Sequence, residues 1–280
     1  MRKLGSEEVR KSVKLVFGAI AVLCAVLCFA ESPVTPLVNA HAHNDYEHER
    51  PLLDALDHGF CSVEADIYLV DGKLLVAHDR KDVKPERTLQ ALYLGPLRER
   101  VRTNGGRVYP NGPTVRLLVD IKGDGVQTYD ALRKVLAQYE EMLTVFAQGK
   151  IEEKAVTVIL SGDSPRDVLK SEPRRLAAID GRLSDLDGPI DPSLTPLISD
   201  SWTGTFKWNR DGEMPRDIRD NVKAAVDKAH AGGAAVRFWA IPHREDFWAA
   251  LLDAGVDLIN ADDLPRLQRF LLERAGKTGQ

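Results

Sequence analysis

The sequence predicts a single α/β domain, a TIM-like (β/α)8 barrel, over residues 31–280. Two observations carry this prediction. Short apolar segments alternate with longer amphipathic segments along the chain, an order typical of a parallel sheet covered by helices. About eight such units fit into about 250 residues, which is the usual size of this barrel. We find no linker, repeat or low-complexity stretch that would divide this region.

The expected strands are short runs of apolar residues, some clear and two weaker. Runs of about four to eight residues of this kind are typical of strands buried in a parallel sheet. The weaker pair is Leu176–Ala178 and Leu197–Ile198, and a hairpin strand is expected at Lys73–Ala77. The clear runs are Leu37–Ala40, Ser62–Leu69, Val115–Ile121, Val156–Leu160, Val236–Ala240 and Leu258–Asn260.

The expected helices lie between these strands. Apolar residues recur at helical spacing, as at Leu136, Tyr139 and Leu143, and this spacing indicates one buried helix face. Irregular, polar loops are expected at Thr103–Pro113 and Gly181–Pro196. The expected helices are Arg50–His58, Thr128–Ala147, Pro215–Ala231, Arg244–Ala254 and Pro265–Ala275.

The composition excludes several classes of protein. Hydrophobic residues make up 44% of the chain and charged residues 29%, which is ordinary for a globular protein and excludes wholesale disorder. The formal net charge is −4 and the pI is about 6.0, so the chain has no surplus of basic residues. We therefore expect no nucleic-acid partner.

The first thirty residues have the pattern of a secretory signal peptide. Basic residues precede the apolar run Leu15–Ala30, and Glu31 and Pro33 follow it. The run has sixteen residues, whereas a membrane-spanning helix needs about 20. We expect residues 1–30 to be a signal peptide or, alternatively, an N-terminal anchor. The expected location is the periplasm or the extracellular space, with attachment to a membrane by residues 15–30 as the alternative.

Removal of residues 1–30 would change the charge and the cysteine content. Five basic and two acidic residues would leave, so the net charge would become −7. Cys61 would remain as a single cysteine, which excludes an intrachain disulfide. A negative protein is poorly suited to anionic lipid surfaces, so we expect no stable membrane partner unless the N-terminal segment stays uncleaved.

Polar side chains, most of them ionisable, collect at the ends of the expected strands. In a (β/α)8 barrel the carboxyl ends of the strands form the active-site face. Side chains from distant parts of the chain are therefore expected to meet there. In chain order they are His41, His43, Asn44, Glu64, Asp66, His78, Asp120, Lys122 and Asp262.

These residue types suit chemistry at phosphorus. Glu64 and Asp66 fall on one side of their strand, and Asp120 ends the next one. Three carboxylates without a thiolate favour one hard divalent cation, Mg²⁺ or Ca²⁺. Imidazoles near such a cation supply a general acid and a general base close to neutral pH. A lysine at the same place can neutralise an anionic oxygen.

The order of these residues resembles a known pattern. His41/Asn44 match H-x-x-N, Glu64/Asp66 match E-x-D, His78 follows about a dozen residues later, and Asp120/Lys122 match D-x-K. Over residues 37–272 the chain resembles the PLC-like phosphodiesterase superfamily. This superfamily includes glycerophosphodiester phosphodiesterases, phosphatidylinositol phospholipases C and sphingomyelinases D. The resemblance is greatest to a branch with the sequence HAHND at the first strand.

The resemblance implies roles for individual residues and a class of substrate. Glu64, Asp66 and Asp120 would hold one divalent metal ion, while His41 and His78 would form the acid–base pair. His43 would then be a surface or supporting residue. The substrate would be a small phosphodiester or a lysophospholipid-type molecule. The residues expected to contact it are Asn44, Lys122, Trp239 and Asp262.

Two departures from the pattern concern the substrate side. Ala42 follows His41 where glycerophosphodiesterases carry arginine, and Asp262 stands where the venom enzymes carry asparagine. Two alternative functions remain open. The His41-x-His43 opening is also that of amidohydrolase-like metal hydrolases, although this chain has no histidine between His78 and His230. A barrel of this kind could also bind a lipid headgroup without turnover.

The segment Ser201–Asn209 is rich in aromatic residues, and it allows two interpretations. Trp202, Phe206 and Trp208 could be buried against the rim of the barrel. Alternatively, the segment could be a lid whose rings contact the alcohol part of the substrate while Lys207 attracts its anionic group.

Overall fold

The computed structural model describes residues 34–208 and 212–278. The predicted signal peptide or anchor therefore lies outside the described residues. Among the residues that are described, no helix is long and apolar enough to cross a membrane.

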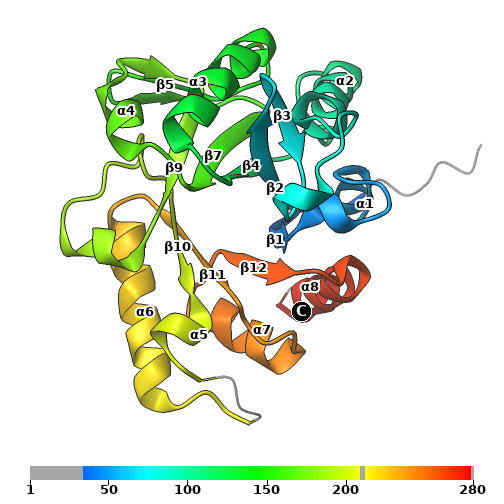
Figure 1. The fold of residues 1–280 in the computed structure, drawn as a ribbon. Coiled ribbons are helices and arrows are strands. Elements are labelled where there is room, and N and C mark those ends of the chain that lie inside the picture. The colour runs from blue at the N-terminus through cyan, green and yellow to red at the C-terminus, as the bar shows by residue number, and fades with distance from the viewer. Residues whose placement is uncertain (1–33, 209–211, 279–280) are drawn as a thin grey trace, which may run out of the picture. The chain divides into compact units, whose positions relative to one another are not determined.

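The main sheet closes into a barrel of parallel strands, as Figure 1 shows in a view along its axis. The first strand, β1, pairs with β2 on one side and with β12 on the other, and these two pairings close the ring. The short strand β3 (Lys73–Val76) pairs antiparallel with the last residues of β2, so that β2 and β3 form a hairpin. The parallel strands are β1 (Leu37–Ala42), β2 (Phe60–Val70), β4 (Val115–Ile121), β7 (Val156–Gly162), β9 (Ala177–Gly181), β10 (Leu197–Ser201), β11 (Ala235–Trp239) and β12 (Leu258–Ala261).

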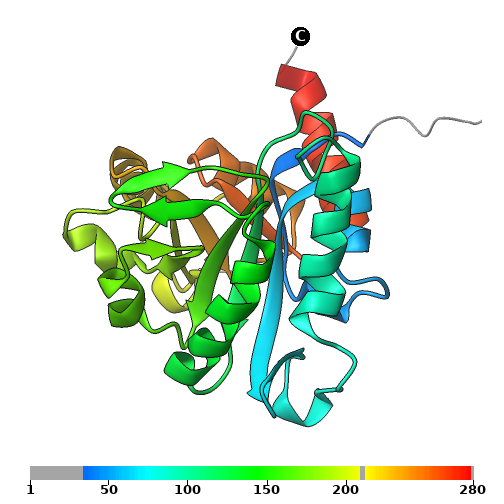
Figure 2. The ribbon, with the colours of Figure 1, turned by 90° about the horizontal axis from the view of Figure 1, so that it is seen from above.

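The predicted barrel is confirmed, including both of its weaker strands. Helices lie around the sheet, and Figure 2 shows the β2–β3 hairpin at one end of the barrel and the end of α8 at the other. Most neighbouring parallel strands are joined through these helices, and β9 is joined to β10 by a segment with one 3₁₀ turn, so each strand returns in the same direction. The helices are α1 (Leu53–Asp57), α2 (Gly95–Thr103), α3 (Gly125–Leu136), α4 (Arg166–Ser171), α5 (Trp202–Thr205), α6 (Arg216–Ala231), α7 (Glu245–Asp253) and α8 (Leu264–Thr278).

The predicted helix Thr128–Ala147 is too long. Helix α3 ends at Leu136, one further turn follows, and Val145–Ala147 form strand β5 of a small antiparallel sheet. The other strands of this sheet are β6 (Lys150–Glu152) and β8 (Arg174–Arg175). Leu143 is buried although it lies beyond the helix. Apolar spacing reports burial, and here burial continues after the helical backbone has ended.

Helix α2 was not predicted from the sequence. It is rich in arginine, and Leu97 is its one fully buried residue. A single buried position gives no periodic signal, so packing of this helix against the barrel decides its structure.

The aromatic segment is packed into the core. Trp202 is fully buried and meets Phe238 and Phe247 edge to face, at ring-centroid distances of 5.6 and 4.8 Å. Its indole Nε1 donates a hydrogen bond to the carbonyl oxygen of Trp208, whose ring stacks on Phe247. These contacts favour the buried interpretation over the lid.

Replacing Trp202 with alanine should lower the free energy of unfolding by about 3–5 kcal/mol, because it leaves a large cavity among three phenylalanine rings. Urea denaturation measures this loss. Trp208→Ala is the matched control and should cost less, since Trp208 is only partly buried. If Trp202→Ala leaves the unfolding free energy unchanged, the segment is not part of the core.

Candidate active site

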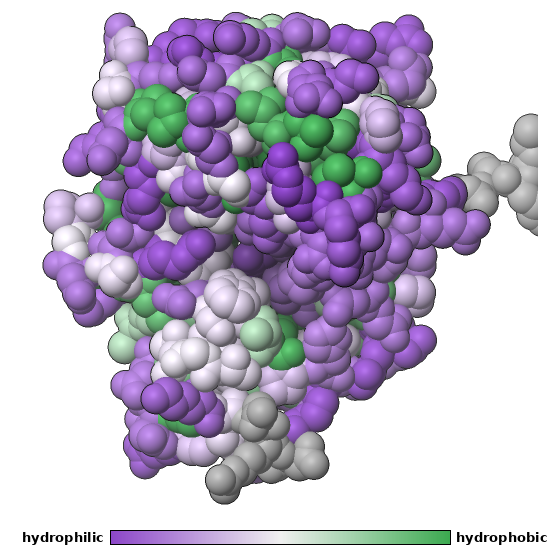
Figure 3. Space-filling view, in the orientation of Figure 1, coloured by the Kyte–Doolittle hydropathy of each residue, from purple (hydrophilic) through white to green (hydrophobic). Residues whose placement is uncertain are grey.

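The carboxylates predicted to meet lie together at the carboxyl ends of neighbouring strands. Asp66 on β2 stands directly beside Asp120 on β4 in the register of the sheet, and Glu64 lies two residues earlier on β2. Each of the three offers an oxygen within 4.8 Å of the others, an arrangement that could hold a metal ion. Figure 3 shows a hollow near the middle of the molecule in the view along the barrel, with hydrophilic residues around it.

The electrostatics of the cluster fit a divalent cation. Burial raises the pKa of Asp66 to about 6, and the charges of Glu64 and Asp120 act in the same direction, while Lys122 opposes them. The Lys122 Nζ lies 3.1 Å from a carboxylate oxygen of Asp66 and 3.1 Å from one of Asp120. The second oxygen of Asp66 is buried without a hydrogen bond from any described residue. Crowded negative charge and an unsatisfied oxygen are what a bound cation would relieve.

Two residues at the end of β7 hold Asp120 in place. Ser161 Oγ donates a 2.9 Å hydrogen bond to Asp120 Oδ2. Gly162 follows with φ of +67°, and a Cβ there would lie 2.3 Å from Asp120 Oδ1. Glycine is therefore required here both for the backbone conformation and for the close approach of the carboxylate.

His41 is fully buried and lies beside Glu64 of the carboxylate cluster. Its Nδ1 is 2.7 Å from Ser62 Oγ, and its Nε2 is 3.1 Å from Glu64 Oε2 and 2.6 Å from Arg237 Nη1. Burial and the charge of Arg237 lower the pKa of His41 to about 4. Burial alone would raise the pKa of Glu64, but Arg237 and His41 hold it below its ordinary value.

His78 lies at the surface of the site, with 55% of its side chain exposed. Its Nδ1 is 2.9 Å from the Tyr46 hydroxyl, which also lies 2.7 Å from Asn44 Oδ1 and 2.8 Å from Asp66 Oδ2. A phenol has one hydrogen to donate, and both of these oxygens are acceptors. Nδ1 of His78 therefore donates to Tyr46, and Nε2 remains as the proton acceptor.

The other predicted substrate residues lie around the same end of the barrel. Trp239 ends β11 and is partly exposed. Asn44 has a left-handed backbone (φ 46°) and accepts from Tyr46. Asp262 follows β12, and its Oδ1 lies 2.8 Å from Nδ1 of His43.

Three residues of the site were not predicted from the sequence: Tyr46, Ser161 and Arg237. Arg237 left a signal, because a charged residue within the apolar run Val236–Ala240 is unusual for a buried strand. Tyr46 and Ser161 left none, since both are common in loops and at strand ends. Their roles depend on partners that lie far away in the chain.

Asp45 supports the loop that carries Asn44 and Tyr46. Its buried carboxylate accepts hydrogen bonds from the Leu52 backbone N–H (2.5 Å) and from the Tyr93 hydroxyl (2.8 Å). Burial nevertheless raises the pKa of Asp45 to about 7, because the two hydrogen bonds only partly offset the loss of solvation.

This raised pKa predicts a pH-dependent loss of stability. A carboxyl group with a higher pKa in the folded state stabilises the fold at low pH, and that contribution declines as the pH rises from about 4 to about 7. Asp45→Asn should therefore unfold with a flatter pH profile, differing from wild type by roughly 3–4 kcal/mol across this range. Urea denaturation at several pH values measures it. The exposed Asp227→Asn change is the control, and parallel profiles for Asp45→Asn and wild type would contradict the prediction.

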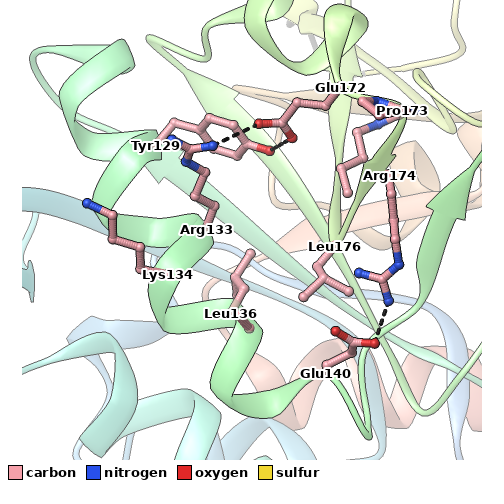
Figure 4. A pocket seen from close by; sticks show the side chains of 11 residues that line it. Tyr129, Arg133, Lys134, Leu136, Glu140, Glu172, Pro173, Arg174 and Leu176 are labelled. Atoms are coloured by element: carbon pink, nitrogen blue, oxygen red, sulfur yellow. Dashed lines mark hydrogen bonds and ion pairs between the residues drawn. The ribbon is translucent and has the colours of Figure 1, made fainter.

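A separate cavity of about 480 Å³ lies beside α3 and β8, away from the predicted site residues. Figure 4 shows Arg133 and Arg174 of its wall paired with neighbouring acids, while Lys134 has no such partner in this view. Arg174 pairs with Glu140, Arg133 lies 3.7 Å from Glu172, and Tyr129 donates to Glu172. These pairs compensate part of the positive charge of the wall, and we assign this cavity no role.

The structure is a closed parallel barrel with three carboxylates, a lysine and histidines at the carboxyl ends of its strands. The fold is similar to a glycerophosphodiester phosphodiesterase from Parabacteroides distasonis, with a TM-score of 0.52 and 14% identity over 86% of this chain and 99% of the other. A second one, from Agrobacterium tumefaciens, has a TM-score of 0.50 and 15% identity over 85% of this chain and 100% of the other.

The chain belongs to the family of the AIM6-like phosphodiesterase domain, whose profile matches residues 30–178. Among its relatives is the "Altered inheritance of mitochondria protein 6 homolog" of Arthroderma benhamiae, which is 30% identical over 81% of this chain and 82% of the relative. The "Altered inheritance of mitochondria protein 6" of Lachancea thermotolerans is 32% identical over 85% of this chain and 68% of the relative. The protein of the same name from Saccharomyces cerevisiae is 30% identical over 80% of this chain and 68% of the relative.

These relatives correct the predicted location. Their name refers to mitochondria and not to export, so the assignment to the periplasm or extracellular space is wrong. The location was predicted from the apolar run Leu15–Ala30 and the basic residues before it. An apolar run preceded by basic residues shows that a segment leaves water readily, but it does not show which membrane the segment meets.

Proposed function

We propose that this protein is a metal-dependent phosphoric diester hydrolase that acts on glycerophosphodiesters or on phospholipid-derived diesters such as lysophospholipids. The observation that carries the proposal is the cluster of Glu64, Asp66 and Asp120 with the Lys122 ammonium and His78 beside it. Carboxylates for a cation, a cation for an anionic oxygen and an imidazole for a proton are the groups that this cleavage requires.

Each of these groups has a separate task in the proposal. Glu64, Asp66 and Asp120 would hold Mg²⁺ or Ca²⁺, and the bound ion would withdraw negative charge from the phosphate oxygens. Lys122 would bind a further phosphate oxygen. Nε2 of His78 would carry one of the two protons that move in the reaction. Asn44 and Trp239 would contact the remainder of the substrate.

The geometry does not favour the amidohydrolase alternative. That class uses both histidines of an HxH sequence as metal ligands, whereas in this barrel both ring nitrogens of His41 already have partners. Nδ1 lies beside Ser62, and Nε2 lies between Glu64 and Arg237. The described carboxylates, rather than the histidines, form the cluster suited to a metal ion.

A substrate screen tests the proposal. The full chain would be incubated with glycerophosphocholine, lysophosphatidylcholine or phosphatidylinositol, with Mg²⁺ or Ca²⁺, and the products identified by mass spectrometry. We expect cleavage of at least one phosphodiester bond and its loss on addition of EDTA. Headgroup binding without turnover would instead support a non-catalytic barrel, and cleavage of amides alone would support the amidohydrolase alternative.

A further inference from the structure

We propose that Arg237 couples the binding of the metal ion to the binding of the anionic substrate. Arg237 weakens metal binding when the site holds no anion, and a phosphate group in the site removes this penalty. The two ligands therefore strengthen each other's binding. This inference rests on the metal cluster of the proposed function and adds a dependence between its two ligands.

Arg237 reaches the metal cluster through the interior of the barrel. It lies on β11, and the strands β12 and β1 separate β11 from β2 in the sheet. A side chain of β11 can therefore contact Glu64 on β2 only across the inside of the barrel. Arg237 Nη1 lies 3.1 Å from Glu64 Oε2 and 2.6 Å from His41 Nε2. A guanidinium group has only donors, so this nitrogen of His41 is an acceptor and the imidazole is neutral.

The charge of Arg237 is poorly solvated. Only 4% of its side chain is exposed. Leu258, which pairs with Arg237 in the register of the sheet, belongs to a buried apolar cluster with Leu118, Ile159 and Leu197. Water and salt screen a buried charge much less than a charge at the surface. Arg237 therefore acts strongly on any charge that binds inside the barrel.

The charges around the cluster favour a cation and an anion together. Glu64, Asp66 and Asp120 carry three negative charges, and Lys122 and Arg237 carry two positive charges. A divalent cation alone would leave the group with one positive charge. A phosphodiester group carries one negative charge and would neutralise it.

The other buried acid near Arg237 does not cancel its charge. Asp180 on β9 is buried, and its Oδ2 lies 3.1 Å from Nη1 of Arg182, which compensates it. Among the described carboxylates, Glu64 is the one within ion-pair distance of Arg237. The positive charge of Arg237 is therefore directed at the metal cluster.

Arg237 acts on the two ligands in opposite directions. Its guanidinium lies against a carboxylate of the metal cluster, so it repels a cation at that cluster and attracts a phosphate group. Nε donates to Ser199 Oγ at 3.2 Å, but Nη2 forms no hydrogen bond with a described residue. Two N–H groups are thus left over for a phosphate oxygen. Linkage requires that each ligand raise the affinity for the other by the same factor.

Isothermal titration calorimetry of the full chain at pH 8 tests the coupling. Mg²⁺ is titrated with and without dimethyl phosphate, a phosphodiester anion that binds free Mg²⁺ only weakly. In wild type, dimethyl phosphate should raise the affinity for Mg²⁺ by about 5–150-fold, the usual range for two coupled ligands. The reciprocal titration should give the same factor for dimethyl phosphate.

Variants of Arg237 separate this coupling from a structural role. Arg237→Met and Arg237→Gln remove the charge, so both should bind Mg²⁺ alone more tightly than wild type, and the coupling factor should fall by about fivefold or more. Gln retains an N–H donor for Glu64 and decides the outcome if the Met variant does not fold. Arg237→Lys keeps the charge and should keep most of the coupling. Arg133→Met, which removes an exposed arginine of α3, is the control.

The opposite result for Mg²⁺ alone would overturn the inference. If the uncharged variants bind Mg²⁺ more weakly than wild type, Arg237 only holds Glu64 in place. Equal affinities of wild type for Mg²⁺ with and without dimethyl phosphate would also overturn it. Failure of the proposed function gives a different result, because coupled binding would still be measured although wild type cleaves no phosphodiester. If Mg²⁺ binds under neither condition, both the inference and the proposed metal site are wrong.

Discussion

Asp66→Asn should abolish both metal-dependent phosphodiester cleavage and the rise in melting temperature on addition of Mg²⁺ or Ca²⁺. Asp66 is the central member of the cluster, because it stands beside Asp120 in the sheet and contacts Lys122 and Tyr46. Glu64→Gln and Asp120→Asn should have the same two effects, since an amide oxygen carries no charge to attract the cation.

The melting temperature of the metal-free protein provides a second test of this prediction. The pKa of Asp66 is raised to about 6, so the carboxylate form, which predominates at pH 7, is less favourable in the folded state than in the unfolded state and lowers the free energy of unfolding. Without metal, Asp66→Asn should therefore melt at no lower a temperature than wild type at pH 7, although it has lost metal binding. Differential scanning fluorimetry with EDTA and with each metal separates the two effects. Asp130→Asn, an exposed ion-pair change on α3, is the control.

Unchanged metal-induced stabilisation in all three carboxylate variants would exclude this cluster as the metal site. A variant that loses activity but keeps the full metal response would show that its carboxylate acts on the substrate instead. The melting curves and the activity assay therefore have to be read together.

His78→Asn should lower kcat by about 10²–10⁴-fold, the usual contribution of a placed general acid or base. Because the side chain is largely exposed, its loss should leave the melting temperature unchanged. Stopped assays on the best substrate of the screen, at saturating concentration, measure the effect.

Two further variants make the His78 result specific. Tyr46→Phe removes the partner of His78 Nδ1 while keeping the ring, and should give a smaller decrease in kcat than His78→Asn. His230 lies on α6 and forms an exposed pair with Asp257. His230→Asn disrupts this pair and is the control for histidine removal. A decrease of less than about tenfold for His78→Asn would remove this residue from the proposed acid–base pair.

The fold could be predicted because its signals are local. Most residues of the parallel strands are buried, so the strands appear as apolar runs, even where the run is as short as Leu197–Ile198. The predicted secondary structure was wrong where the pattern of buried residues does not match the backbone conformation. Val145–Ala147 continue a helical spacing but form a strand, and α2 buries too few residues to show a period.

The candidate site was predictable in its acidic part for the same reason. Alternation along one strand puts Glu64 and Asp66 on one face, and neighbouring parallel strands bring Asp120 beside them. The residues that position the site were not predictable, because Tyr46, Ser161 and Arg237 act on partners in other elements.

The sequence by itself determined the barrel, the three carboxylates, Lys122 and the nearby histidines, because side-chain alternation and strand ends are local properties of the chain. The resemblance assigned proton transfer to His41 rather than to His43, but alternation along the strand cannot choose between them, since residues two apart on a strand point to the same side. Only the tertiary structure separates them. Arg237, 196 residues away in the chain, closes over His41, and the register of β1 with β12 places Asp262 beside His43. Contacts between residues so far apart depend on how the barrel closes, and no spacing within the sequence reports them.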